Sequence, residues 1–428
     1  MNVKFSKKIS NLLFNIRNKG FFHLLLANFL INFLGFGSQL FVAKFLSATD
    51  LGRIKTMQSF ISLAVIFAGF GFNTAVLKLC SENKSLDEKR YILIENCKLT
   101  FVGVVLTIII MAMLAFLGYL SPDKEVNHWM LLYMFSIPAA VFTSLFICYV
   151  QALKKIQLMS YVQVGIRSLG VLCLIVFTYY WKLPGFILSS VLVGLIALIP
   201  LFRLSEIDWK NRPKKIDILR RSIYYGKWSM ASNGFNALGI SIDILLLNYL
   251  VKDRTILGDY GLATIFILAM NQITGTVQAI ATPFFSEKSE DGGEFIRVLK
   301  KYNRLLIILA GVMSLIAIVV VPLFTKLIYK EKYQMTGAFF QFLVLRYFFW
   351  SCYALLGVAM VGLGRMKDNF IASSINVPFA ILFTFLFISF WGPIGAAYAQ
   401  ALSGIVAMVI VYLNFNRVLR GHFQSRGF

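Results

Sequence analysis

Apolar runs of membrane length recur along the whole chain and are separated by short polar segments. A helix that crosses a bilayer needs about 20 consecutive, mainly apolar residues. The pattern therefore predicts an all-α membrane protein with twelve transmembrane helices. The predicted spans cover residues 21–46, 56–79, 91–120, 129–152, 157–181, 184–203, 223–250, 257–285, 296–326, 336–363, 367–391 and 394–416.

Two of these spans, 223–250 and 257–285, carry polar side chains every three or four residues. That spacing places each set on one helical face. The first two spans have a similar stripe, so four helices with polar faces are expected to enclose a hydrophilic cleft. The candidate residues of this substrate cavity are Asn28, Asn32, Gln39, Gln58, Ser62, Asn73, Asn233, Asn236, Asn271 and Gln278. The alternative is that small and polar residues here only hold helices together.

The composition agrees with a membrane protein, because only 14% of the residues are charged, against about 25% in soluble proteins. The net charge of +23 would suggest a nucleic-acid partner in a soluble chain. Here most basic residues lie in loops on one side of the predicted spans, so no nucleic-acid partner is expected. The positive-inside rule places both termini and the basic segment 204–222 in the cytoplasm.

The chain is expected to lack a cleavable signal peptide, a metal site and an enzyme site. Its basic first twenty residues run into an apolar segment without a small-residue cleavage pattern. The five cysteines are scattered without a CxxC pair, and the three histidines are far apart. No Walker motif is present, so ATP hydrolysis is not expected.

An internal duplication is indicated by matches at a nearly constant offset. Trp181 aligns with Trp391, Gly185 with Gly395, and Gly52 with Gly258. We predict an N-terminal six-helix lobe at 1–203, a cytoplasmic linker at 204–222 and a C-terminal six-helix lobe at 223–428. The two lobes would be related by a pseudo-two-fold axis, with the substrate site between them.

A few charged residues fall inside or at the ends of predicted spans. Asp243 is the most interior acid, and a charge at mid-bilayer costs roughly 2.5–3.5 kcal/mol on insertion scales. It either couples transport to a proton or cation, or forms a buried ion pair with Arg167 or Arg346. Basic residues near the cleft suit an anionic ligand, whereas snorkelling to the interface is the alternative. The basic candidates are Arg53, Lys55, Lys78, Arg167 and Arg346.

Several segments together resemble a known family. They are SIDILLLNYL at 241–250, LGDYGLA at 257–263, ATPFFSE at 281–287, AKFLSATDLGRIKTMQSF at 43–60, GLGRMKDNF at 362–370 and FWGPIGAAYAQALSG at 390–404. In order and spacing, the chain resembles the Wzx-type O-antigen and polysaccharide flippases. These form the polysaccharide transporter branch of the multidrug/oligosaccharidyl-lipid/polysaccharide exporter superfamily.

The resemblance implies a MATE-like fold and a flippase of a bacterial inner membrane. Its ligand would be an undecaprenyl-pyrophosphate-linked oligosaccharide, moved from the cytoplasmic to the periplasmic leaflet. The basic candidates above would bind the pyrophosphate, and the stripe amides would bind sugar hydroxyls. No cofactor is implied, although a proton or sodium gradient could drive transport, with Asp243 as the coupling residue. A polysaccharide polymerase and a chain-length regulator are the implied partners. Unlike the related lipid II flippases, this chain lacks two extra spans and a central arginine in its first helix.

Three other functions compete with this one. A drug or small-solute cation antiporter of the same fold would have an aromatic cavity with paired carboxylates. A polysaccharide polymerase or ligase would need a large periplasmic loop, and the predicted outer loops are short. A channel or scaffold would not need a duplicated cleft.

Overall fold

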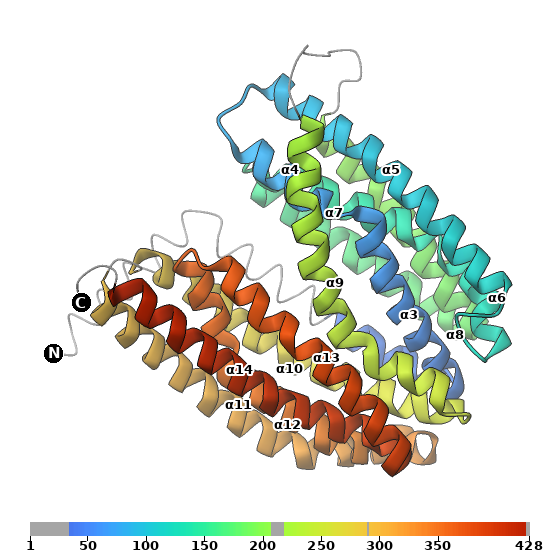
Figure 1. Ribbon diagram of the computed structural model, residues 1–428. Coiled ribbons are helices and arrows are strands. Elements are labelled where there is room, and N and C mark those ends of the chain that lie inside the picture. The colour runs from blue at the N-terminus through green and yellow to red at the C-terminus, as the bar shows by residue number, and fades with distance from the viewer. Residues whose placement is uncertain (1–33, 207–217, 289–290, 425–428) are drawn as a thin grey trace. The chain divides into compact units, whose positions relative to one another are not determined.

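The computed structural model describes residues 34–206, 218–288 and 291–424, and its regular elements are helices (Figure 1). A helix over residues 34–45 precedes the labelled elements. These are α3 (Ala48–Gly69), α4 (Phe72–Ser81), α5 (Leu86–Phe116), α6 (Lys124–Tyr133), α7 (Ser136–Ala152), α8 (Ile156–Ser205), α9 (Ile218–Leu250), α10 (Arg254–Glu287), α11 (Gly292–Tyr329), η1 (Lys330–Tyr333), α12 (Thr336–Gly362), α13 (Met366–Trp391), η2 (Gly392–Ile394) and α14 (Gly395–Gln424).

The twelve predicted spans match these helices, which confirms the fold class. The first span is described only in its C-terminal part. The second comprises α3 and α4, and the fourth is the pair α6 and α7, bent by 45°. The fifth and sixth spans form the continuous element α8, whose helical geometry is interrupted at Lys182. Each remaining span corresponds to one helix from α5 to α14.

The internal repeat predicted from the sequence is present in the backbone. Lys154 and Gly364 occupy equivalent positions, and their φ angles are 60° and 75°. Lys182 and Gly392 are also equivalent, with φ angles of 52° and 65°. Positive φ is uncommon outside glycine, so its recurrence at matched positions indicates that both halves use the same turns between helices.

Close packing explains why the aligned glycines recur after the second of these turns. A Cβ atom on Gly185 would lie 2.0 Å from the carbonyl oxygen of Phe177, and one on Gly395 would lie 2.0 Å from that of Phe387. A side chain at either position would therefore collide with the preceding helix. The aligned tryptophans pack edge-on against the same two phenylalanines.

Contacts divide the chain into two compact units. Among the described residues, the first unit contains 34–38, 64–114, 129–206 and 218–230, and the second contains 39–63, 115–128, 231–288 and 291–424. The helix over residues 34–45 and helices α3, α5, α6 and α9 contribute residues to both units. These units differ from the two predicted sequence lobes, and that division stays a prediction. Most of the predicted linker, 207–217, lies outside the described residues.

In the first unit, the beginning of α9 packs against α4. A Cβ atom on Gly71 would lie 2.5 Å from the carbonyl oxygen of Gly226, so the two backbones touch. The hydroxyls of Thr74 and Ser229 are 2.7 Å apart. Ile218 completes a buried apolar cluster with residues from α4, α5, α7 and α8. The start of α9 is therefore anchored to the first half of the chain.

A charged cluster follows α4 in the same unit. Glu82 forms ion pairs with Lys84 and with Arg221 of α9, the latter with a nitrogen–oxygen distance of 2.5 Å. The hydrogen bond from Lys84 is the main cause that lowers the pKa of the Glu82 carboxyl, and the bond from Arg221 adds to it. This carboxylate therefore stays ionised to a lower pH than an unperturbed glutamate does. The cluster lies at the end of its span for which the sequence predicts a cytoplasmic location.

The second unit is organised around α12, which packs against α10, α11 and α14 (Figure 1). Its core includes Phe285 of α10, Phe295 of α11, and Leu355 and Ala359 of α12, each 0% exposed. Helix α13 packs mainly on α14. This bundle fixes the helical faces that line the cavity described next.

Candidate functional site

A cavity of about 590 Å³ lies within the second unit. Helices α3, α9, α10, α12, α13 and α14 all contribute to its wall. All of its lining residues belong to 39–63 or 231–428, so it is formed inside one unit. It is large enough for a drug-sized ligand or part of a larger one.

Amide and hydroxyl groups make up much of the polar lining. Gln58 and Ser62 come from α3, Asn236 from α9, and Asn271 from α10. The hydroxyl of Ser62 lies 3.5 Å from that of Ser241 across the contact between α3 and α9. Amide side chains both donate and accept hydrogen bonds. Such a wall can satisfy ligand hydroxyl groups that would otherwise lose their hydrogen bonds on leaving water.

Aromatic rings line part of the same cavity. Trp350 and Tyr353 come from α12, and Phe235 comes from α9. Flat apolar surfaces beside hydrogen-bonding groups can bind a ligand that has both apolar faces and polar edges. The cavity thus offers hydrogen-bonding groups and flat apolar surfaces to the same ligand.

Asp243 of α9 is 2% exposed and lines the cavity. The Tyr260 hydroxyl of α10 donates a hydrogen bond to its carboxylate. Arg346 of α12 lines the cavity as well, acts electrostatically on this carboxylate, and donates a 3.4 Å hydrogen bond to the carbonyl of Gly239. Both side chains thus line one cavity, but among the residues that the structure describes no ion pair joins them, and the predicted pairing of Asp243 stays a prediction.

Lys55 of α3 is a second cation of this wall. Its residue is 7% exposed, and its ammonium donates a 3.1 Å hydrogen bond to the side-chain carbonyl of Gln39. Its aliphatic stem lies on Gly261 of α10, where a Cβ atom would be 2.6 Å from the lysine Cγ. The sequence placed the start of this span at residue 56, but α3 begins at Ala48. Lys55 therefore lies about 10 Å inside the helix, at 1.5 Å per residue.

Helices α3 and α10 touch near the predicted periplasmic end of the cavity. A Cβ atom on Gly258 would lie 1.9 Å from the carbonyl oxygen of Ala48, and one on Gly52 would lie 2.7 Å from that of Arg254. Gly52 and Gly258 are equivalent in the internal repeat. Two matched glycines thus bring corresponding helices of the two sequence halves into backbone contact.

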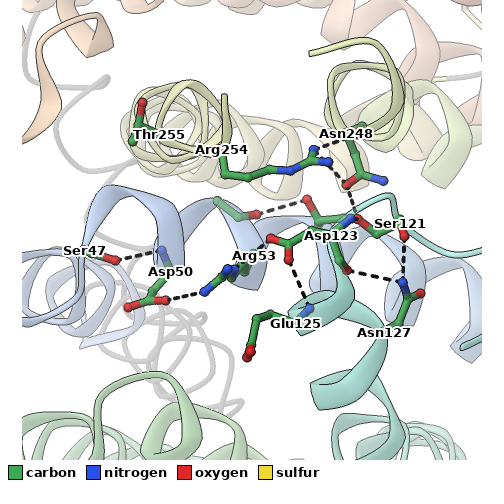
Figure 2. Close-up of polar contacts among 12 residues, drawn as sticks. Ser47, Asp50, Arg53, Ser121, Asp123, Glu125, Asn127, Asn248, Arg254 and Thr255 are labelled. Carbon is green, nitrogen blue, oxygen red and sulfur yellow. Dashed lines mark hydrogen bonds and ion pairs between the residues drawn. The ribbon is translucent and has the colours of Figure 1, made fainter. Parts of the chain in front are cut away.

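A polar network surrounds this contact, and Figure 2 shows how its side chains meet. The Arg53 guanidinium lies between Asp123, at 2.8 Å, and Asp50, at 3.3 Å. Asn248 of α9 accepts a 2.7 Å hydrogen bond from the Ser121 hydroxyl, and its backbone carbonyl accepts one from Arg254. The network joins α3 to the segment before α6. It also joins that segment to α9, and α9 to the start of α10.

Asp259 of α10 occupies the repeat position that corresponds to Arg53. Its carboxylate accepts hydrogen bonds from the backbone of Met335 and Thr336 and from the Thr336 hydroxyl, at 3.2, 3.1 and 2.8 Å. It therefore caps the first turn of α12, whose amides lack helical partners. In the first half, Arg53 instead contacts Asp123, which caps α6.

Replacing Asp259 with alanine is expected to destabilise the protein by about 1–2 kcal/mol, the usual cost of losing a helix cap. Asp259→Asn keeps one oxygen that can accept these bonds and is expected to cost less. Thermal unfolding of the purified variants in detergent measures both values. Equal stability of Asp259→Ala and the unchanged protein would contradict this role.

The structure brings together some of the residues predicted for the site. The cavity is lined by Gln58, Ser62, Asn236, Asn271, Asp243, Lys55 and Arg346, and Gln39 contacts Lys55. Asn73 instead donates to Ser144 in the first unit, and Gln278 donates to the carbonyl of Ala354. Asn233 is exposed and lies outside the lining. Asn28 and Asn32 lie outside the described residues.

The remaining basic candidates lie elsewhere. Arg53 is held by two carboxylates, and Lys78 is exposed on α4 in the first unit. The guanidinium of Arg167, on α8, lies against Gly35 in the same unit. Sequence reasoning missed Trp350, Tyr353, Tyr260 and Ser403. The aromatic-rich segment 347–353 was a signal for Trp350 and Tyr353. Which of its side chains face the cavity depends on how α12 packs.

The profile of a known protein family covers most of this architecture. The family described as polysaccharide biosynthesis protein matches residues 18–289. The chain belongs to this family. It is a flippase family of the multidrug/oligosaccharidyl-lipid/polysaccharide exporter superfamily, which confirms the resemblance drawn from the sequence. A membrane protein from Methanocaldococcus jannaschii is 22% identical over 397 residues, which cover 86% of this chain and 91% of the relative.

Solved structures of transporters and of a flippase have a similar fold. An inward-facing MATE multidrug transporter matches with a TM-score of 0.75 and 11% identity, covering 94% of this chain and 96% of the other. The lipid II flippase MurJ, in an inward closed conformation, matches with a TM-score of 0.75 and 15% identity, covering 94% and 91%. A transporter of the same superfamily from Pyrococcus furiosus matches with a TM-score of 0.65 and 13% identity, covering 93% and 95%. The protein is a multi-pass membrane protein with a transporter fold.

Proposed function

We propose that this protein is a flippase for undecaprenyl-pyrophosphate-linked oligosaccharides, such as O-antigen or related polysaccharide repeat units. It would move them from the cytoplasmic to the periplasmic leaflet of a bacterial inner membrane, with both termini in the cytoplasm. The observation that carries the proposal is the composition of the cavity wall. Amides and hydroxyls from α3, α9 and α10 face the same space as the aromatic rings of α12.

Sugars fit this wall because they are polar at the edges and apolar on the ring faces. An oligosaccharide in bare hydrocarbon would lose hydrogen bonds at several kcal/mol each. The amides of Gln58, Asn236 and Asn271 can replace those bonds. The ring of Trp350 can cover a sugar face. The polyprenyl tail would stay in the lipid while the glycan crosses.

Alternating access is the transport mechanism that suits a duplicated helical transporter with a central ligand. The contact between Gly52 and Gly258 would break as the periplasmic side opens. Lys78, exposed near the inner end of α4, is suitably placed for the pyrophosphate at loading. Asp243 is our candidate for coupling to a proton or sodium gradient. A polysaccharide polymerase and a chain-length regulator would act on the product.

A drug or small-solute cation antiporter is the second candidate. The aromatic residues Trp350 and Tyr353 beside Asp243 favour it, since these groups could bind an organic cation. Arg346 and Lys55 in the same wall oppose it, because two cations would repel such a ligand. The solved neighbours are transporters and a flippase, which agrees at the family level with a protein that is not an enzyme.

Deletion of the gene in its host tests the proposed function. We expect undecaprenyl-linked repeat units to accumulate on the cytoplasmic face and surface polysaccharide to be lost. The unchanged gene should restore both, and a gene encoding Gly258→Ala should restore neither. Normal surface polysaccharide in a deletion strain that lacks a second flippase would refute the proposal.

A further inference from the structure

Helices α5 and α11 are equivalent in the internal repeat, and both begin with a capped, charged first turn. At an offset of 206 residues, Ser85 aligns with Asp291 and Glu88 with Glu294. The Ser85 hydroxyl accepts a hydrogen bond from the backbone amide of Glu88, and the Asp291 carboxylate accepts one from that of Glu294. Because the caps coincide, the turns that follow them can be compared position by position.

The charges that follow these caps differ between the two helices. On α5, Lys98 forms an ion pair with Glu95 at 2.6 Å. The aligned residues of α11 are Arg304 and Lys301, so a base replaces the acid. Lys300 adds a third base, and among the described residues neither it nor Arg304 forms an ion pair. Helix α11 therefore carries three bases where α5 carries a compensated pair.

These three bases lie on the side of α11 that points away from the protein. Lys300, Lys301 and Arg304 are exposed, whereas Leu299 and Leu306 are buried. The same side of the helix continues with apolar side chains that are more than half exposed, namely Leu305, Ile308, Val312, Leu315 and Val319. An exposed apolar face of this length marks a surface that contacts membrane lipid. The bases therefore lie at one end of a lipid-facing stripe.

The length of the apolar segment sets the depth of the three bases. Residues 305–325 of α11 contain no charged side chain and cover about 30 Å, the thickness of the hydrocarbon core. Arg304 therefore lies at the edge of this core, and Lys300 lies about 6 Å further out. The headgroup layer is roughly 5–8 Å deep on each side. All three side chains thus fall at the level of the lipid phosphates, on the side that the sequence predicts to be cytoplasmic.

We propose that Lys300, Lys301 and Arg304 form a docking surface for anionic phospholipids of the cytoplasmic leaflet. The two ammonium groups and the guanidinium donate hydrogen bonds to the lipid phosphates, and the acyl chains lie along the apolar face that begins at Leu305. Charge complementarity favours a headgroup with a net negative charge, because a zwitterionic headgroup brings its own cation. The surface lies outside the cavity and does not depend on the identity of the transported ligand.

Lipid retention by the purified full-length protein tests this surface. Native mass spectrometry measures the binding of phosphatidylglycerol and of phosphatidylcholine with the same acyl chains. We expect the unchanged protein to bind phosphatidylglycerol about tenfold or more tighter than phosphatidylcholine. Arg304→Gln should lose several-fold of this preference, Arg304→Lys should keep most of it, and the double variant Lys300→Gln with Arg304→Gln should abolish it. Lys98→Gln is the matched control, because it removes one charge at the aligned position of α5 and should leave the preference unchanged.

A second variant copies the charge pattern of α5 onto α11. Lys301→Glu should pair with Arg304 as Glu95 pairs with Lys98, and it should lower the preference at least as much as Arg304→Gln. Thermal unfolding in detergent without added lipid checks that the variants are folded. Added phosphatidylglycerol should raise the unfolding temperature of the unchanged protein more than that of Arg304→Gln.

Two results would overturn the surface. One is equal binding of the two lipids by the unchanged protein, which would leave these bases as a topology signal only. The other is a loss of preference in Lys98→Gln as large as that in Arg304→Gln, because lipid binding would then follow the net charge of the protein and not this face of α11.

Discussion

Replacing Gly258 with alanine is expected to reduce transport at least tenfold while the protein remains folded in the membrane. The added Cβ atom would lie 1.9 Å from the Ala48 carbonyl oxygen, a distance that no rearrangement of a side chain can relieve. Helices α3 and α10 must therefore separate at the predicted periplasmic end. Overpacking of this kind costs about 1–3 kcal/mol, which biases the protein against the state in which the two helices touch.

Gly275→Ala on the same helix is the matched control. A Cβ atom on Gly275 meets nothing within 4 Å, and alanine favours a helix over glycine. It should transport normally. Transport is measured with a fluorescent lipid-linked oligosaccharide in proteoliposomes. Access of an impermeant thiol reagent to a cysteine at Ser62, in a protein without its native cysteines, reports the opening. A Gly258→Ala protein that transports and labels like the control would show that this contact does not close the cavity.

Removing either charge of Asp243 and Arg346 alone is expected to destabilise the protein by about 1–3 kcal/mol, whereas removing both should restore part of that loss. Asp243 is 2% exposed, and Arg346 acts on its carboxylate electrostatically without a direct ion pair among the described residues. Asp243→Asn leaves the guanidinium without its counter-charge, and Arg346→Gln does the same to the carboxylate. Unfolding of the singles and the double variant in detergent gives the coupling free energy.

The exposed pair of Arg365 and Asp368 is a suitable control for this cycle. Its charges are 3.9 Å apart at the start of α13, and about half and a third of the side chains are exposed. Exposed pairs contribute about 0–1 kcal/mol, so Asp368→Asn should have little effect. Additive effects of the two cavity substitutions would mean that Asp243 and Arg346 do not stabilise each other. Transport by Asp243→Asn at the unchanged rate under every imposed pH gradient would exclude this carboxylate from coupling.

The fold could be predicted from the sequence because its signals are local. Apolar length gave the spans, and the repeated Trp181 and Trp391 turns reflect the same tight packing against a preceding helix. The polar stripes were less reliable for a physical reason. Phe70 and Gly71, with φ angles of 45° and 70°, break the helix between α3 and α4. A face defined by 3.6 residues per turn does not continue across such a break.

The consequence of that break is visible in the second span. Gln58 and Ser62 precede it and line the cavity, whereas Asn73 follows it and bonds to Ser144. Gln278 was also predicted to face the cavity, but its amide donates to a carbonyl of the neighbouring α12. Which partner an amide chooses depends on the packing of a distant helix. The sequence pattern does not contain that information.

Lys55 illustrates the same limit for charges. Its position near the predicted start of a span suggested either an anion ligand or interfacial snorkelling. The helix in fact begins at Ala48, and Gly261 on α10 makes room for the lysine stem. Only the contact with Gly261, which lies about 200 positions away in the sequence, distinguishes burial of Lys55 from snorkelling.

Transbilayer movement of a lipid-linked oligosaccharide by the purified protein tests the central claim most directly. Proteoliposomes containing the protein and a fluorescent polyprenyl-pyrophosphate oligosaccharide are exposed to an impermeant quencher. We predict that the unchanged protein equilibrates the glycan across the bilayer, while Gly258→Ala leaves it as slow as in protein-free liposomes. The account would be contradicted if the unchanged protein moved the glycan no faster than it moves in protein-free liposomes. This result would have to hold under imposed proton and sodium gradients of either direction.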